Sequence, residues 1–205
     1  ASIGSSGSYF KGTFDGNEKS ISNLSVKGKG LFYTDSNAPI KITKLTLDKL
    51  TVTGPNGSSG EIGAIASDIH SGDVIEGCVV KNSHITCENS FGNPWIGGIV
   101  GANYGGAITN CIVEDTEITA STDNTTESGL LARAAGIVCN NSGSVSGCQV
   151  KGNTIVTAAH KKASDVTAGA IVCVKNGTFA NNTYEYTVKT RTKGSGEADY
   201  TVKQN

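Results

Sequence analysis

Residues 108–111 read Ile-Thr-Asn-Cys, one of six copies of a short motif that recurs along the chain. The other copies are Ile21-Ser-Asn-Leu24, Ile42-Thr-Lys-Leu45, Ile75-Glu-Gly-Cys78, Val145-Ser-Gly-Cys148 and Phe179-Ala-Asn-Asn182. The last four intervals between copies are 33 to 37 residues long. A nearly fixed period of this size indicates a repeat protein, in which each copy heads one structural unit.

Each unit contains short apolar segments with the alternation of β-strands. An apolar or aromatic residue stands two positions past the motif in every unit: Val26, Leu47, Val80, Val113, Val150 and Tyr184. Four units carry a β-branched residue further on: Val52, Ile85, Ile118 and Ile155. A third apolar stretch, such as Gly97-Gly-Ile-Val100, completes each unit. No segment shows sustained helical spacing, so the sequence predicts three short strands per unit.

Such units bury their apolar edges only by stacking on their neighbours. The expected fold is therefore all-β, a right-handed parallel β-helix of about five turns with three short strands per turn. We expect an N-terminal entry or capping segment at 1–20, the β-helix repeats at 21–190, and a C-terminal capping strand or linker at 191–205. Loops at 54–61, 87–95, 120–133 and 157–167 are expected to cluster on one side.

A column of alternating charges supports this alignment. The residue three positions past the motif changes sign from each unit to the next, and stacking would bring these side chains together on the outer surface. We interpret them as a structural charge ladder that contributes on the order of 0.2–1 kcal/mol per contact. The ladder contains Lys27, Asp48, Lys81, Glu114, Lys151 and Glu185.

Composition excludes several functional classes. The formal net charge is −1, which argues against a nucleic-acid partner, and no apolar run is long enough for direct membrane insertion. The 205 residues include no methionine, so we expect a piece of a longer protein with flanking domains. Six cysteines permit disulfides, but their register favours reduced thiols stacked in columns, one with Cys78, Cys111 and Cys148 and another with Cys139 and Cys173.

The sequence offers no catalytic constellation. The three histidines, His70, His84 and His160, lie in predicted turns or loops and outside any metal-binding frame, so we expect no metal and no cofactor. An enzymatic function would require loop carboxylates to converge within catalytic reach. The candidates for such a cluster are Glu88, Asp123, Glu127 and Asp165.

The best candidate for ligand contact is the polar stretch from Glu88 to Trp95, with Tyr104 in the following turn. Phe91, Trp95 and Tyr104 could form a platform for a sugar ring or a protein surface. The alternative is that Phe91 and Trp95 fold back over the solenoid as a lid.

Two segments resemble a known family. Phe10-Lys-Gly-Thr-Phe-Asp-Gly16, followed by Ile21-Ser-Asn-Leu24 and Gly30-Leu-Phe32, resembles the opening of GLUG-motif repeat proteins. Gly97-Gly-Ile-Val-Gly101 followed by Ile108-Thr-Asn-Cys111 resembles an internal copy. The resemblance implies a secreted or surface-attached bacterial protein whose repeats act as adhesive or spacer modules.

We therefore expect a non-catalytic extracellular or cell-surface module that acts in adhesion or as a structural stalk. Its expected partners are host or matrix glycans or proteins. The alternatives are a carbohydrate-binding protein and a small polysaccharide-degrading β-helix enzyme. The sequence supplies no catalytic residue that the resemblance could assign.

Overall fold

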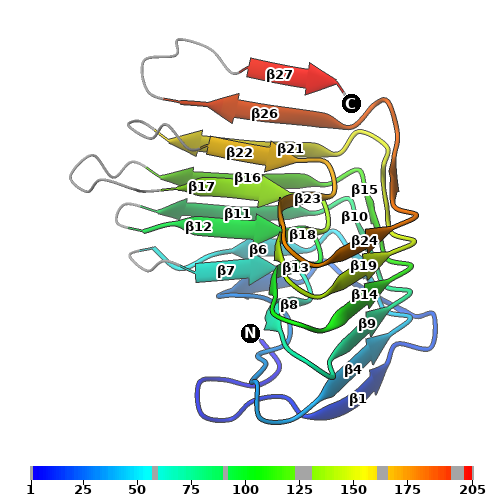
Figure 1. The fold of residues 1–205 in the computed structure, drawn as a ribbon. Helices are drawn as coiled ribbons and strands as arrows, with labels where there is room; N and C mark the ends of the chain where they lie inside the picture. The colour runs from blue at the N-terminus through cyan, green and yellow to red at the C-terminus, as the bar shows by residue number, and fades with distance from the viewer. Residues whose placement is uncertain are drawn as a thin grey trace.

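Five β-sheets wind around a common core to form a β-solenoid (Figure 1). The computed structural model describes residues 2–56, 60–89, 92–122, 131–160, 166–194 and 201–204. Every strand pairs in parallel with its equivalent in the next turn, except at the C-terminal end, where β26 and β27 are antiparallel. No helix of the described residues is long and apolar enough to cross a membrane.

Three of the sheets extend over nearly the whole solenoid. Sheet I contains β1 (Gly12–Asp15), β4 (Ile40–Thr43), β9 (Val74–Glu76), β14 (Ala107–Thr109), β19 (Ser144–Ser146) and β24 (Thr178–Ala180). Sheet II contains β2 (Ser20–Ser22), β5 (Thr46–Asp48), β10 (Val79–Lys81), β15 (Ile112–Glu114), β20 (Gln149–Lys151) and β25 (Thr183–Tyr184). Sheet III contains β3 (Ser25–Lys27), β6 (Thr51–Thr53), β11 (His84–Asn89), β16 (Glu117–Thr122), β21 (Ile155–His160), β26 (Lys189–Lys193) and β27 (Thr201–Gln204).

Two shorter sheets complete each turn. Sheet IV contains β7 (Gly60–Gly63), β12 (Pro94–Gly97), β17 (Ala132–Ala135) and β22 (Val166–Gly169). Sheet V contains β8 (Ala66–Ile69), β13 (Val100–Asn103), β18 (Val138–Asn141) and β23 (Val172–Lys175). Four turns, starting at β4, β9, β14 and β19, visit all five sheets, and partial turns lie before and after them.

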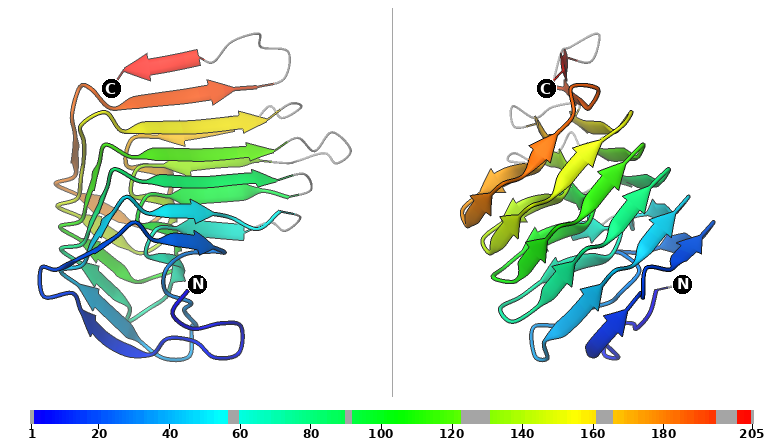
Figure 2. Two further views of the ribbon diagram at one scale, coloured as in Figure 1. Left: turned by 180° about the vertical axis from the view of Figure 1, so that it is seen from behind. Right: turned by 90° about the vertical axis from the view of Figure 1, so that its right-hand side faces the viewer.

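The predicted parallel solenoid is confirmed, but the prediction of three strands per turn was too low. In Figure 1 the chain ascends from the N-terminus, the near strands of sheet IV run to the right and the far strands of sheet III run to the left, so the coil is right-handed; the view from behind in Figure 2 agrees. The additional strands arise because two of the predicted strands are each divided by a corner. The motif segment forms two strands, such as β14 and β15, and the third apolar stretch forms two more, such as β12 and β13.

The first repeat was placed in the wrong register. Phe14, rather than Ile21, pairs with Ile42, and Ile21 pairs with Leu47 in sheet II. Sheet I therefore begins at Gly12, inside the segment predicted as a cap. In sheet III the inward residue of β21 is Val156, which pairs with Ile118, whereas Ile155 pairs with Glu117.

Inward side chains form continuous apolar columns through the core. Cys78, Cys111 and Cys148 continue the column that Leu45 begins, all of them buried, and the six cysteines are free thiols. Cys139 and Cys173 also lie in one row, in sheet V, but outside this core, because their parity is opposite to that of the inward residues Val138 and Val172; the Cys173 thiol donates to the Ala134 carbonyl at 2.8 Å. The column of sheet I contains Phe14, Ile42, Ile75, Ile108, Val145 and Phe179.

The charge ladder lies on sheet II, with one correction. Lys81 pairs in register with Asp48 and with Glu114, and the Lys151 ammonium lies 3.6 Å from the Glu114 carboxylate. Lys27 does not belong to the ladder, because it pairs with Thr53 in sheet III. Ser22 occupies the corresponding position opposite Asp48. The alternation of charge thus begins at Asp48.

Hydroxyl groups satisfy the buried backbone at the corner between sheets II and III. The Ser83 hydroxyl donates to the Lys81 carbonyl and accepts from the Leu50 amide, at 2.6 and 3.0 Å. Thr116 and Thr154 repeat this arrangement one and two turns later. Each hydroxyl thereby links two turns and pairs with one buried backbone amide of the corner.

Candidate functional site

The structure brings two of the three predicted ligand-binding residues to one surface, the outer side of sheets IV and V. Trp95 lies on β12 and pairs in register with Glu61 of β7 and Arg133 of β17. The Arg133 guanidinium lies 5.8 Å from the Trp95 ring centroid. Trp95 is half-buried, and Phe91 lies outside the described residues.

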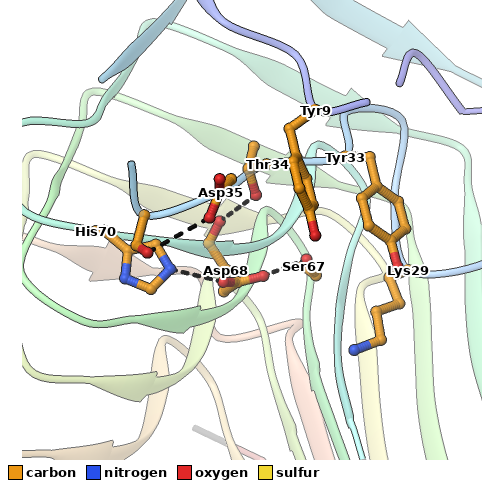
Figure 3. A pocket seen from close by; sticks show the side chains of 9 residues that line it. Tyr9, Lys29, Tyr33, Thr34, Asp35, Ser67, Asp68 and His70 are labelled. Atoms are coloured by element: carbon orange, nitrogen blue, oxygen red, sulfur yellow. Dashed lines mark hydrogen bonds and ion pairs between the residues drawn. The ribbon is translucent and has the colours of Figure 1, made fainter. Parts of the chain in front are cut away.

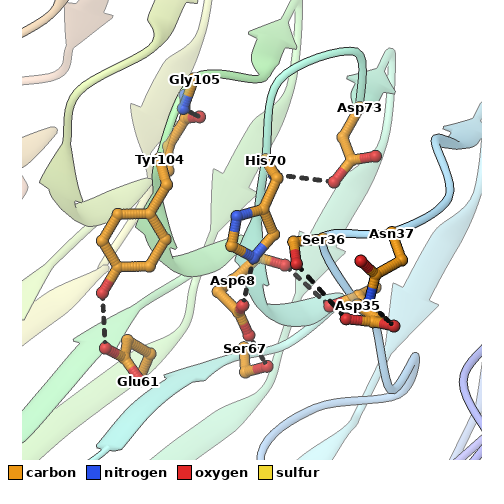
Figure 4. Close-up of polar contacts among 12 residues, drawn as sticks. Asp35, Ser36, Asn37, Glu61, Ser67, Asp68, His70, Asp73, Tyr104 and Gly105 are labelled. Carbon is orange, nitrogen blue, oxygen red and sulfur yellow. Dashed lines mark hydrogen bonds and ion pairs between the residues drawn. The ribbon is translucent and has the colours of Figure 1, made fainter.

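Glu61 connects Trp95 to Tyr104. Tyr104 follows β13, is 44% exposed, and donates a hydrogen bond from its hydroxyl to Glu61 Oε1 at 2.7 Å (Figure 4). Burial, this hydrogen bond and the charges of Glu61 and Asp68 raise the pKa of the Tyr104 phenol. Tyr104 therefore stays protonated and acts as a hydrogen-bond donor at neutral pH.

His70 extends this surface toward the first turn. Its imidazole stacks on the Tyr104 ring, with centroids 5.5 Å apart and planes inclined by 25°. His70 Nε2 lies 2.8 Å from Asp68 Oδ2, and the Ser67 hydroxyl donates to the other oxygen of Asp68 (Figure 4). These contacts fix both the imidazole and the carboxylate in orientation.

A buried aspartate holds the turn that carries His70. Asp73 is 2% exposed and accepts hydrogen bonds from the backbone amides of His70 and Ile40, at 2.7 and 2.9 Å. The Asp73 amide in turn donates to the His70 carbonyl at 3.0 Å. Because a buried carboxylate requires such partners, Asp73 has a structural role and holds the turn that carries His70 in place.

An open depression of about 320 Å³ adjoins His70. Tyr9 and Tyr33 form an aromatic pair in it, with ring centroids 5.8 Å apart. In the view of Figure 3, Asp35, Asp68 and His70 lie on one side of the Tyr9 ring, while Tyr33 and Lys29 lie on the other. We call this the tyrosine depression; it is lined by Tyr9, Lys29, Tyr33, Thr34, Asp35, Ser36, Ser67, Asp68 and His70.

Backbone contacts position the walls of the tyrosine depression. The Phe10 amide donates to the Tyr33 carbonyl at 2.8 Å, and the Tyr33 amide donates to the Ile3 carbonyl at 2.9 Å. These bonds fasten the N-terminal segment alongside the first turn. The Thr34 hydroxyl donates to the Asp68 carbonyl at 2.8 Å and joins the first turn to β8. The tyrosine depression is therefore built from the N-terminal segment and two successive turns.

The Asp35 carboxylate is oriented by its own loop. It accepts from the side-chain amide of Asn37 at 2.8 Å and from the Ser36 hydroxyl at 3.4 Å. The hydrogen bond from Asn37, followed by smaller contributions from Ser36, lowers the pKa of Asp35. Asp35 is thus a fixed hydrogen-bond acceptor at neutral pH.

Sequence reasoning missed the residues that connect this surface. His70 was interpreted as a solvated turn residue, and Glu61, Asp68 and Asp35 were not singled out. A weak signal existed, because residues 68 and 70 have the same parity at the end of a strand and project to one side. Their link to Tyr104 depends on the stacking of turns and has no local sequence signature.

The structure also bears on the metal and enzyme expectations. In the described ranges, no group of three or more His, Cys, Asp and Glu side chains is arranged to hold a metal ion. Among the loop carboxylates proposed as an enzymatic cluster, Glu88 is exposed near the end of β11. Asp123, Glu127 and Asp165 lie outside the described residues. The absence of an enzymatic function stays a prediction.

Comparison with known proteins identifies one repeat. Residues 93–119 match the model of the GLUG motif. This stretch runs from the start of β12 into β16 and includes both Trp95 and Tyr104. Comparisons with curated proteins and with solved structures gave no significant match. The chain is therefore a β-solenoid repeat protein that carries the GLUG motif.

Proposed function

We propose that this protein is a non-catalytic recognition module that acts in adhesion outside a bacterial cell. The observation that carries the proposal is the surface formed by Glu61, His70, Trp95 and Tyr104 beside the tyrosine depression. Partly exposed aromatic rings with fixed polar neighbours suit recognition of a glycan or a protein. The resemblance to GLUG-motif proteins supports the extracellular setting.

A structural stalk is the second candidate. It is supported by ladders of parallel strands that continue through four complete turns. Such a body keeps its ends at a fixed separation, as expected of a spacer between flanking domains of a longer chain. Adhesion and spacing are compatible roles, and they differ in whether the solenoid itself binds a ligand.

The proposal is tested by binding of the 205-residue protein to immobilised polysaccharides and extracellular-matrix proteins. Wild type is compared with Trp95→Ala, Tyr104→Ala and the control Tyr186→Ala, in which a tyrosine that is 72% exposed after β25 is removed. We expect saturable binding that Tyr104→Ala weakens about tenfold or more and that Tyr186→Ala retains. Thermal unfolding curves verify that each variant is folded.

The panel also distinguishes the alternatives. Failure of wild type to bind any member would contradict adhesion and leave the stalk. Release of soluble sugar from a polysaccharide would instead support a degrading enzyme. Equal loss of binding in Tyr104→Ala and Tyr186→Ala would show that the binding site lies elsewhere.

A further inference from the structure

The tyrosine depression combines an aromatic wall with hydrogen-bonding groups. Tyr9 and Tyr33 are half-buried and lie with ring centroids 5.8 Å apart, and the surface that lines the depression is mainly polar. The remaining lining consists of hydroxyl, carboxylate, imidazole and ammonium groups. A pyranose ring carries a rim of hydroxyl groups, which can pair with these hydrogen-bonding groups.

The two carboxylates are pre-oriented acceptors. Asp35 is held by Asn37 and Ser36, while Asp68 is held by His70 and Ser67. A carboxylate has about four lone-pair positions, so each group can accept further hydrogen bonds from a ligand. Because the protein already holds both carboxylates in place, a ligand would lose little free energy in ordering them.

The charges disfavour ligands of high charge of either sign. Asp35 and Asp68, with Glu61 nearby, repel polyanions such as sulfated glycans. Lys29 also lines the tyrosine depression. Its side chain lies against β7, since a Cβ placed on Gly60 would be 3.3 Å from Lys29 Cε. The Lys29 ammonium weakens the attraction for polycations. The mixed charge therefore favours an uncharged ligand with many hydroxyl groups.

We infer that the tyrosine depression binds a neutral saccharide, with Tyr9 and Tyr33 lining the bound sugar and Asp35 and Asp68 accepting hydrogen bonds from its hydroxyl groups. This inference rests on the proposed recognition function and names the class of ligand. The Glu61–Tyr104 pair lies beyond His70 and would extend the site to a second sugar unit.

Isothermal titration calorimetry of the 205-residue protein tests the inference with three sets of probes. The neutral set contains malto-, cello-, manno- and xylohexaose, the anionic set contains hexagalacturonate and a heparin hexasaccharide, and the cationic set contains chitosan hexamer and hexalysine. We expect saturable binding of at least one neutral probe. Its dissociation constant should stay the same between 50 and 500 mM salt, because no net charge is neutralised.

Variants locate the bound sugar. Asp35→Asn keeps the shape of the side chain and removes its charge, and Tyr33→Ala removes half of the aromatic pair. We expect both to weaken neutral-sugar binding about tenfold or more, whereas Tyr186→Ala leaves it unchanged. If Tyr33→Ala lowers the melting temperature, Asp35→Asn alone decides the outcome, because Asp35 lies in a loop at the surface.

The outcomes separate this inference from the proposed function. Binding of only anionic or cationic probes, or neutral binding that both variants leave unchanged, would overturn the saccharide inference. If a matrix protein binds through Tyr104 and no neutral sugar binds, the inference fails and the recognition function stands. If no probe and no matrix protein binds, both fail.

Discussion

Single residues in the left-handed region set the corners of this solenoid. At the corner between sheets I and II, the third residue of the five motifs from Ile42 onward has a φ of 50 to 64°, as in Lys44, Gly77 and Asn110. At the corner between sheets II and III, residues such as Asn23 and Asn82 have φ values of 58 and 50°. Both corners therefore select the same local pattern, and for this reason Ile21-Ser-Asn-Leu24 was assigned to the wrong corner.

Asn110 allows a test of this conformational requirement. Its φ of 54° is tolerated by asparagine and glycine, but costs a residue with a branched Cβ about 1–2 kcal/mol or more. We expect Asn110→Val to lower the free energy of unfolding by at least that amount, measured by urea denaturation. Asn110→Gly should change it by less than about 1 kcal/mol. Equal effects of the two variants would contradict the assigned corner.

The phenol of Tyr104 should titrate abnormally. Its pKa is raised in the folded protein, so the stability that the contact with Glu61 contributes is fully present below the ordinary value near 10 and is lost as pH rises through the raised folded-state pKa. We expect the difference in phenolate absorbance between wild type and Tyr104→Phe to be close to zero at pH 10.5. A difference curve with a midpoint near 10 would show that the hydrogen bond to Glu61 does not form.

At the scale of elements, the charge ladder shows how far sequence register can be trusted. The pairs Asp48–Lys81, Lys81–Glu114 and Glu114–Lys151 were predicted correctly because their repeats have similar lengths. The assignment of Lys27 to the ladder was wrong because the first repeat was aligned one corner too late. Repeat periodicity thus predicts strand register where the repeat length is regular. It predicts the wrong register in the first repeat, which is shorter.

Glu114→Lys tests the ladder directly. The substitution places a third lysine between Lys81 and Lys151, with which Glu114 pairs in register. We expect the melting temperature to fall, and to fall more at 20 mM than at 500 mM salt, because exposed like charges are screened by salt. Glu114→Gln is the matched control and should show a smaller shift. A shift of Glu114→Lys that does not depend on salt would contradict the register.

Sheets IV and V were the elements that the sequence concealed. Their strands β12 and β13 are separated by a turn at Gly98 and Ile99, which the sequence analysis treated as one apolar segment. A Cβ at Gly98 would come within 2.1 Å of the Gly136 carbonyl oxygen, so this glycine allows two turns of backbone to approach closely. Such contacts form between successive turns, so their only sign in the sequence is an isolated glycine.

At the scale of the whole molecule, the fold could be predicted and most of the site could not. Period and alternation identified a parallel solenoid, because both are local properties of each repeat. The surface near Tyr104 depends on residues from different turns, such as Tyr33, Glu61 and His70, that meet only after winding. Aromatic residues in polar surroundings pointed to Trp95 and Tyr104, but not to the carboxylates that accompany them.

Thiol chemistry tests the packing of the whole core. Five of the six cysteines are buried, and burial together with the charge of Glu88 raises the pKa of Cys87 to about 11. We expect slow alkylation of the native protein at pH 8 and about six reactive thiols in denaturant without reductant. Fewer than five reactive thiols in denaturant would show that disulfides form between adjacent turns.

The central claim is that ligand recognition takes place where the first turns meet, around the tyrosine depression and Tyr104. The most direct measurement is hydrogen–deuterium exchange of the protein with and without the panel ligand that saturates it. We predict slower exchange in the ligand-bound protein at residues 33–37, 70–73 and 104–106, with no change at 176–188. Slower exchange confined to the C-terminal turn, or to the strands of sheets I and II, would contradict recognition at this surface.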